Sequence, residues 1–369
     1  MEKPKYPYFS SGPCKKYSSF NFQNLNTALI GRAHKSDGAI NRLLEVNQLM
    51  KEILNIPTNY EIVLTPGSDT GAVESCIWCM LGERKVDIMS CEYFGKKWTQ
   101  DLEDLNLDFN LYDARYGESP DLCKYNSNND LVFVLNATTS GVYIPNLDWI
   151  SNDREGITIC DATSGLFALD VDWNKLDATT FSWQKMLGGE PGFGMIILSP
   201  RAINRMNIYH PDRAIPYVLN LKKNKKFNAD LLLHGGTVNT FSLLALEDCL
   251  YALKDLKEKG GVSYAVNKVK NSYQVIENFV NGHDWIDFLV EDKIVRSPIS
   301  VTLTLPKFNK EQIQTLIKTL EKENIAFDIR SHFMAPLGLR IWCGPTVDTE
   351  DVKLLFDWIE KVAEDMLNL

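Results

Sequence analysis

Lys185 and Asp161 are the residues whose types and positions in this sequence first indicate chemistry. Lys185 comes shortly after the apolar segment 178–182 and is followed by Gly188-Gly189. Loss of solvation at the end of a buried strand lowers the pKa of a lysine, and the neutral amine can then attack a carbonyl to form a Schiff base. Asp161 follows the segment 156–160, and a carboxylate buried there needs a cationic partner. Alone, Lys185 also fits a surface lysine, and Asp161 a helix N-cap.

A small polar turn between a β-type run and a helical run is the third feature. It contains Ser68, Asp69 and Thr70, and free backbone N–H groups with hydroxyls at a helix N-terminus form a site for an anion. The turn matches neither the P-loop pattern nor the dinucleotide fingerprint, and the glycines of 189–194 have the wrong spacing for the latter. A phosphate site, a carboxylate for a pyridinium nitrogen and a Schiff-base lysine, in this order, together predict pyridoxal phosphate.

Alternating β-type and helical segments must position these residues. The apolar β-type runs are 61–65, 85–90, 131–136, 156–160, 178–182 and 194–199. Their alternation with helical or loop segments favours an α/β fold with a mainly parallel sheet covered on both faces. Ligands bind such sheets at the carboxyl ends of the strands, which is where Asp161 and Lys185 lie in the sequence.

The pattern changes after residue 239. Two long helical segments follow, 241–259 and 262–280, each ending near glycine. Strands are predicted at 299–305, 325–330 and 339–343, and helices at 310–323 and after Asp348. We therefore expect a large domain over residues 1–250, with an N-terminal segment near the active site, and a smaller C-terminal α+β domain over 251–369.

Composition excludes several classes of protein. The chain has 369 residues, a net charge of −9 and a pI near 5.2, which argues against a nucleic-acid partner. No segment has the pattern of a secretory signal or the length of a membrane span, so we expect a cytoplasmic protein. The eight cysteines are scattered and are expected to be reduced, and the spacing Cys76-x-x-Cys79 lies inside an apolar helical run typical of a core. Isolated histidines give no metal site.

With these motifs in place, the sequence resembles the phosphoserine aminotransferase family, among the class V enzymes of fold type I that use pyridoxal phosphate. The resemblance runs from Phe9-Ser10-Ser11-Gly12-Pro13 to the segment 338–344, and Ser182-Trp183-Gln184-Lys185 matches one branch of the family. It implies the fold-type I architecture, a Schiff base on Lys185 and a pyridinium contact from Asp161.

The resemblance also implies further cofactor contacts. Gln184, Ser68, Asp69 and Thr70 would contact the phosphate, Phe94 would stack on the ring, and Thr138 would lie near the ring hydroxyl. Asn239 and Thr240 match a pair that reaches the phosphate from a second subunit, which implies a homodimer with shared active sites.

For the substrate, the resemblance implies that Arg340 binds the α-carboxylate through a bidentate fork of hydrogen bonds and that Ser11 lies near the substrate. His34 and Lys35 match a His-Arg pair that binds the substrate phosphate across the dimer, and His332 would add a further contact. Here lysine stands where arginine is usual, which keeps the charge but loses the fork.

The implied reaction is reversible transamination between glutamate and 3-phosphohydroxypyruvate, giving O-phosphoserine and 2-oxoglutarate in serine biosynthesis, with a pyridoxine-pathway analogue left open as a substrate. Three alternatives stay open. They are a class V aminotransferase for a non-phosphorylated substrate (alanine–glyoxylate or serine–pyruvate type), a nicotinamide-dependent oxidoreductase, and a non-catalytic small-molecule binder.

Overall fold

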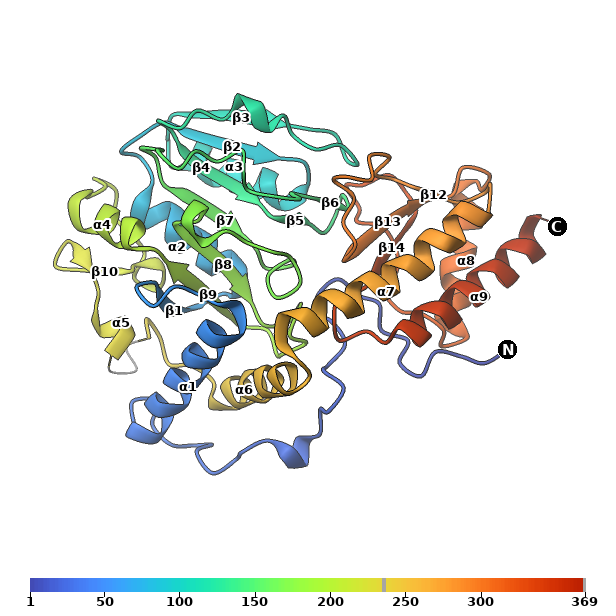
Figure 1. Ribbon diagram of the computed structural model, residues 1–369, viewed down its shortest axis with the longest axis horizontal. Coiled ribbons are helices and arrows are strands. Elements are labelled where there is room, and N and C mark those ends of the chain that lie inside the picture. Colours follow the sequence, from blue (N-terminus) through green and yellow to red (C-terminus); the bar gives the residue numbers. More distant parts are fainter. Residues whose placement is uncertain (234–236, 368–369) are drawn as a thin grey trace.

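The computed structural model describes residues 1–233 and 237–367, so His234 lies outside the described part. Figure 1 shows two lobes, a larger one built around a wide sheet and a smaller one at the other end of helix α7. The division into domains at residue 250 stays a prediction. The expected α/β class, with a mainly parallel central sheet, is confirmed.

The large sheet has seven strands within the described residues, in the order β1-β9-β8-β7-β4-β2-β3. The bounds are β1 (Glu61–Pro66), β2 (Val86–Ser90), β3 (Phe109–Asp113), β4 (Asp130–Val134), β7 (Thr158–Asp161), β8 (Ala178–Ser182) and β9 (Phe193–Leu198). β9 is antiparallel to both neighbours, and the remaining pairs are parallel. The carboxyl ends of β2, β4, β7 and β8 therefore meet at one edge.

Helices cover both faces of this sheet. Side chains alternate along each strand, so that each strand presents apolar groups to the helices on either face. In β1, Ile62 and Leu64 join the core cluster that includes α1 and α6, whereas Val63 faces the cluster that includes α2, α3 and α4. The bounds are α1 (Asp37–Leu54), α2 (Ser68–Met80), α3 (Tyr93–Asp104), α4 (Pro200–Ile208) and α6 (Leu243–Glu258). Gly71 lets α2 lie close to β1, since a Cβ there would collide with the Pro66 carbonyl.

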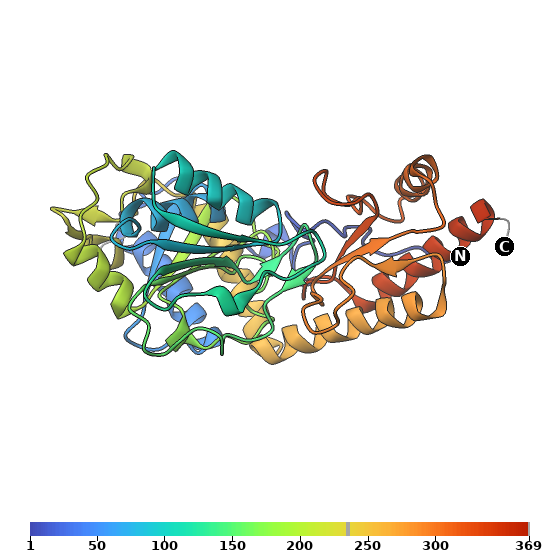
Figure 2. The ribbon, with the colours of Figure 1, turned by 90° about the horizontal axis from the view of Figure 1, so that it is seen from above.

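The smaller lobe is an antiparallel sheet packed against helices, as Figure 2 shows from above. Its elements are α7 (Gly261–Gly282), β12 (Asp287–Phe288), β13 (Ser300–Thr304), α8 (Lys310–Lys322), β14 (Leu339–Trp342) and α9 (Thr349–Leu367). In α9, Val352, Leu355, Ile359 and Val362 are buried. Short elements complete the chain: β5 (Asn136–Ala137) with β6 (Val142–Tyr143), β10 (Lys222–Lys223) with β11 (Lys226–Phe227), and α5 (Asp230–Leu233).

The N-terminal segment ties the two lobes together. On the small-lobe side, the Trp342 N–H donates to the Phe9 carbonyl at 3.2 Å, and the Lys5 N–H donates to Asp351 at 2.7 Å. On the large-lobe side, the Cys14 N–H donates to the Gln184 carbonyl at 2.8 Å. Residues 10–13 are therefore held between the lobes, beside the segment that carries Lys185.

One predicted strand is absent from the structure, and one strand of the large sheet was not predicted. The strand predicted at 325–330 is wrong, because this stretch makes only isolated bridges, Tyr8 with Phe327 and Arg330 with Leu339. Strand β3 was not predicted. Its side chains are half-buried or exposed, so it lacks the continuous apolar run that marks the inner strands.

Candidate active site

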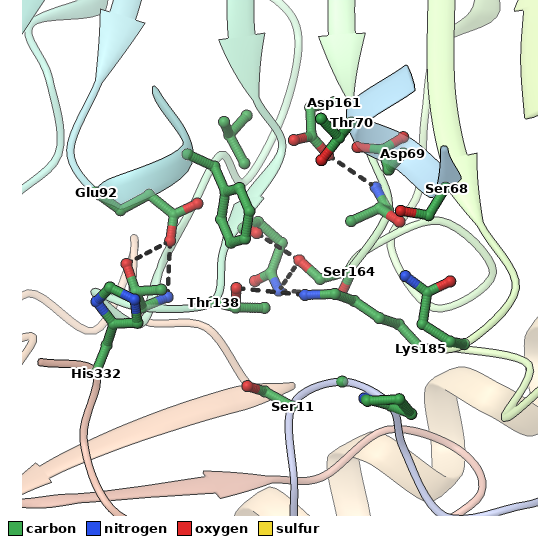
Figure 3. A pocket seen from close by; sticks show the side chains of 18 of the residues that line it. Ser11, Ser68, Asp69, Thr70, Glu92, Thr138, Asp161, Ser164, Lys185 and His332 are labelled. Carbon is green, nitrogen blue, oxygen red and sulfur yellow. Dashed lines mark hydrogen bonds between the residues drawn. The ribbon is translucent and has the colours of Figure 1, made fainter. Parts of the chain in front are cut away.

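A cavity of about 340 Å³ opens at the carboxyl edge of the large sheet, a volume that fits a small organic ligand. It is lined from three sides: by the ends of β2, β4, β7 and β8 with the first turn of α2, by Ser11, Gly12 and Pro13 of the N-terminal segment, and by His332 and Arg340 of the small lobe. Figure 3 shows Lys185 at the end of the large sheet, with Ser11 of the N-terminal segment and His332 of the small lobe on the other side of the cavity.

Lys185 lies at the centre of the cavity. Only 8% of the residue is exposed, and its Nζ donates to Thr138 Oγ1 at 3.5 Å and lies 5.7 Å from the centre of the Phe94 ring. Gly12 packs against its stem, since a Cβ there would stand 3.2 Å from Lys185 Cε. Burial lowers the pKa of Lys185, although the nearby Cys14, Glu92 and Asp161 act in the opposite direction. A buried amine of this kind is suited to nucleophilic attack on a carbonyl.

Asp161 is the last residue of β7 and is 4% exposed. Its Oδ2 accepts a hydrogen bond from Trp98 Nε1 at 3.3 Å, and its Oδ1 accepts one from the Thr163 N–H at 3.2 Å. A donor on each oxygen fixes the orientation of the carboxylate. The side chain can therefore hold a cationic ring nitrogen in the cavity.

The first turn of α2 forms the anion-binding side. Gly67 and Ser68 start the helix with left-handed φ values of +83° and +53°, a conformation that glycine adopts freely and that is strained for Ser68. The amides of Asp69 and Thr70 lie in the first turn, where no earlier helical carbonyl accepts from them. Gln184 Oε1 is buried in the same cavity without a hydrogen-bond partner among the described residues, and Lys97 Nζ donates to Thr70 Oγ1 at 3.4 Å.

Arg340 contributes the cation on the small-lobe side. It lies on β14 opposite Thr302 of β13, and its Nε has no hydrogen-bond partner within the part of the chain that the structure describes. No ion pair within the described part of the chain involves Arg340. Burial lowers the pKa of its guanidinium. A half-buried guanidinium that has no ion pair within the described residues is well suited to a carboxylate ligand.

The unpartnered donors and acceptors in this cavity fit pyridoxal phosphate. A carboxylate for a ring nitrogen, an aromatic face, an amine and a helix N-terminus all line one space. The buried side-chain atoms that lack partners include Asp69 Oδ1, Gln184 Oε1 and Arg340 Nε, and buried polar atoms normally have partners. The site is thus prepared for a polar, anionic ligand with an aromatic ring.

Glu92 and Trp98 line the cavity but were missed by the sequence analysis. Glu92 follows β2, so the rule that located Asp161 could have found it. Its Oε2 accepts from the N–H and Oγ1 of Thr139, each at 2.7 Å, while Oε1 has no partner among the described residues. Burial raises the pKa of Glu92 to about 7.

Four expected residues do not line the cavity of their own chain. His34 packs edge-on against Phe241, with ring centres 5.7 Å apart, and Lys35 is exposed. Asn239 Nδ2 donates to the Thr240 carbonyl at 3.0 Å, away from the cavity lining. The other expected residues do line it: Ser11, Ser68, Asp69, Thr70, Phe94, Thr138, Asp161, Gln184, Lys185, His332 and Arg340.

Burial disfavours a redox role for the cysteine pair. Cys76 and Cys79 are buried in α2, where burial raises the pKa of both thiols, that of Cys79 to about 11. Residues 1–233 and 237–367 contain no cluster of three or more potential metal ligands. Within the same ranges no helix combines the length and apolarity needed to span a bilayer.

Comparisons with known proteins agree with this geometry. Residues 16–341 match the family described as aminotransferase class-V. The chain is 45% identical to the phosphoserine aminotransferase of Methanosarcina mazei over 97% of its own length and 96% of that protein. Among solved structures, phosphoserine aminotransferase from Bacillus circulans subsp. alkalophilus has a TM-score of 0.82 at 16% identity, covering 98% of this chain and 99% of that one. Alanine–glyoxylate aminotransferase from Nostoc sp. has a TM-score of 0.80 at 18% identity, covering 98% and 96%.

Proposed function

Because the chain belongs to the class-V aminotransferase family, we propose that it is a phosphoserine aminotransferase. It transfers an amino group reversibly from glutamate to 3-phosphohydroxypyruvate, giving O-phosphoserine and 2-oxoglutarate in serine biosynthesis. The observation that carries this assignment is the 45% identity, over 97% of the chain, to a protein of that name. The fold alone does not choose the substrate, since the alanine–glyoxylate enzyme shares it.

Pyridoxal phosphate is the cofactor that the site fits. The first turn of α2 and Gln184 would hold its phosphate, Phe94 would face its ring, and Asp161 would face its nitrogen. When bound, it supplies an aldehyde that condenses with amines and a ring that accepts electrons from the substrate's Cα. Thr138, whose hydroxyl is 3.5 Å from Lys185 Nζ, would lie near the ring hydroxyl.

The protein's own side chains supply proton transfer and orientation. Lys185 Nζ is buried and has a lowered pKa, so it can take up the proton of the substrate's Cα and return it as a general acid. Arg340 binds the α-carboxylate with two parallel hydrogen bonds, which fixes the orientation of the bonds at Cα. Gly12 packs against the stem of Lys185, of which only 8% is exposed.

A second copy of the chain is proposed to complete the site. A substrate with a carboxylate and a phosphate needs more positive charge than Arg340 alone provides. His34 and Lys35 do not reach the cavity of their own chain, so they would bind the substrate phosphate as residues of the partner subunit, with His332 adding a contact from the same chain. Asn239 and Thr240 of the partner subunit would likewise reach the cofactor phosphate. A homodimer with shared sites follows.

The first test is an absorption titration of the purified protein loaded with pyridoxal phosphate. O-phosphoserine should convert the yellow form to the colourless pyridoxamine form at a much lower concentration than serine does. The Lys185→Ala variant should bind the cofactor without covalent attachment and show no turnover. Equal responses to serine and phosphoserine would favour a class V enzyme for a non-phosphorylated substrate, and a protein that never takes up the cofactor would refute the proposal.

The shared site has its own test, subunit mixing. Lys185→Ala and Lys35→Ala are each expected to be strongly impaired as homodimers. After mixing in equal amounts with reversible dissociation, half of the dimers are mixed, and each mixed dimer has one site without a substitution. About a quarter of the wild-type activity should then return. If Lys35 acts within its own chain, no activity returns.

A further inference from the structure

Asp69 and Asp161 form a buried pair of carboxyl groups that the reaction described above does not explain. Asp69 is 6% exposed and lies in the first turn of α2, while Asp161 is 4% exposed and ends β7. Figure 3 shows the two side chains next to each other at one wall of the cavity. Two neighbouring buried carboxyl groups repel each other when both are charged, so one of the two keeps its proton and can donate a hydrogen bond to the other.

The surroundings of the pair place this proton on Asp69. Asp161 already accepts hydrogen bonds on both oxygens, from Trp98 Nε1 and from the Thr163 N–H. Asp69 Oδ1, in contrast, has no partner among the described residues. Burial and the neighbouring charge of Asp161 raise the pKa of Asp69, and Thr180 and Lys185 only partly oppose them.

We propose that Asp69 is a positioning residue for Asp161, to which it donates a hydrogen bond as a neutral carboxylic acid, so that Asp161 remains an anion facing the cofactor ring nitrogen. This inference rests on the proposed function, because it concerns the same cofactor site. In this proposal the Asp69 side chain contacts Asp161. Only the backbone N–H of Asp69 then makes the phosphate contact that was expected from the sequence. A carboxylate beside a phosphate would be repelled, whereas the N–H at the helix N-terminus attracts it.

The neutral donor matters because it holds Asp161 in place. With three donors, the Asp161 carboxylate would be fixed facing the ring nitrogen of the cofactor, whose protonated form supplies the electron-withdrawing ring when it is bound. Without the Asp69 donor, Asp161 loses one of the bonds that fix this orientation. Loss of one hydrogen bond to a charged group corresponds to about a 10- to 100-fold loss in rate.

The test compares Asp69→Asn with Asp69→Ala in the cofactor-loaded protein. Asparagine keeps a neutral donor of the same size, so kcat should stay within about threefold of the wild type. Alanine removes the donor, so kcat should fall about 10- to 100-fold. The alanine variant should also shift the pH dependence of the visible absorption of the resting enzyme, with little change in KM. Asp101→Asn is the matched control, because it neutralises another partly buried carboxyl, on α3 and outside the cavity lining.

Infrared difference spectroscopy gives a readout that needs no substrate. The wild type at neutral pH should show the C=O stretch of a protonated carboxyl that Asp69→Asn lacks and that Asp101→Asn retains. An asparagine variant as impaired as the alanine variant, or the absence of this band, would overturn the inference. The band is independent of phosphoserine, so failure of the proposed substrate would appear in the absorption titration and leave the infrared result intact. If Asp69→Ala does not fold, the kcat of Asp69→Asn and the infrared C=O band still test the inference.

Discussion

Replacing Glu92 by glutamine is expected to make the folded protein more stable at neutral and alkaline pH. Glu92 is 1% exposed, and burial raises its pKa from 4.5 to about 7 despite two hydrogen bonds from Thr139 and the charge of Lys185. Glutamine has nearly the same volume, and its amide oxygen can still accept from the Thr139 N–H. The substitution therefore removes the ionisation and keeps the packing.

The magnitude follows from the two pKa values of this one group. Below pH 4.5 the carboxyl is protonated in both the folded and the unfolded chain and contributes nothing. As the pH rises from 4.5 to about 7, the unfolded chain loses the proton while the folded chain keeps it, so stability falls. Above pH 7 the full cost is reached, about 3 kcal/mol at about 1.4 kcal/mol per tenfold change in proton affinity.

The assay is urea denaturation of the cofactor-free protein at several pH values between 5 and 8. The cofactor is removed because a bound anion near Lys185 would change the titration of Glu92. Free energies are taken only where fluorescence and circular dichroism transitions coincide. The Glu92→Gln variant should gain about 2 to 3 kcal/mol on the wild type between pH 5 and pH 8. The control Glu118→Gln, at an exposed glutamate, should track the wild type.

A difference between Glu92→Gln and wild type that stays constant from pH 5 to 8 would refute this reasoning. It would mean that the carboxyl ionises with its ordinary pKa in the folded protein, and that water or a rearranged side chain solvates Oε1. A difference of the opposite sign would show that the charge of Glu92 stabilises the fold.

Two further predictions concern cationic side chains. Arg340→Lys keeps the charge but loses the planar fork, so KM for phosphoserine and for glutamate should rise at least about tenfold while the spectrum of the loaded resting enzyme stays the same; an unchanged KM would contradict the α-carboxylate role. Asp130→Asn should lower the free energy of unfolding by about 2 kcal/mol, since Arg205 binds both oxygens of the fully buried Asp130 at 2.8 and 2.9 Å and would keep only Glu83, at 2.7 Å, as a carboxylate partner. The exposed pair of Lys85 and Asp108, cut by Asp108→Asn, should cost less than about 1 kcal/mol, and equal losses would show that burial is not the cause.

The local parts of the fold could be predicted from sequence, and the non-local parts could not. Strand β8 occupies the predicted residues 178–182, because its side chains are buried on both faces and form an unbroken β-type run. Residues 325–330 have the same apolar character, but Phe327 bridges to Tyr8 of the N-terminal segment. No pattern within a short window reveals a partner that lies far away in the chain.

The residues that line the cavity could likewise be predicted only in part from the sequence. Lys185 and Asp161 were found because ends of parallel strands meet at one edge of a sheet. Glu92 obeys that rule as well. In the segment of Glu92, Tyr93 and Phe94, however, only the aromatic ring of Phe94 was predicted to contact the cofactor. The contact between Asp69 and Asp161 depends on how α2 is placed over β7, which the sequence does not state.

The N-terminal segment that joins the two lobes also constrains the order in which a working enzyme can be made. Lys5 and Asp351 lie 346 positions apart, so a ribosome must finish nearly the whole chain before this contact can form. The large sheet, by contrast, is complete at Leu198. A nascent chain can thus have a folded sheet before Ser11 and Gly12 are held beside Lys185. The cavity around this lysine would therefore be complete only when synthesis is nearly finished.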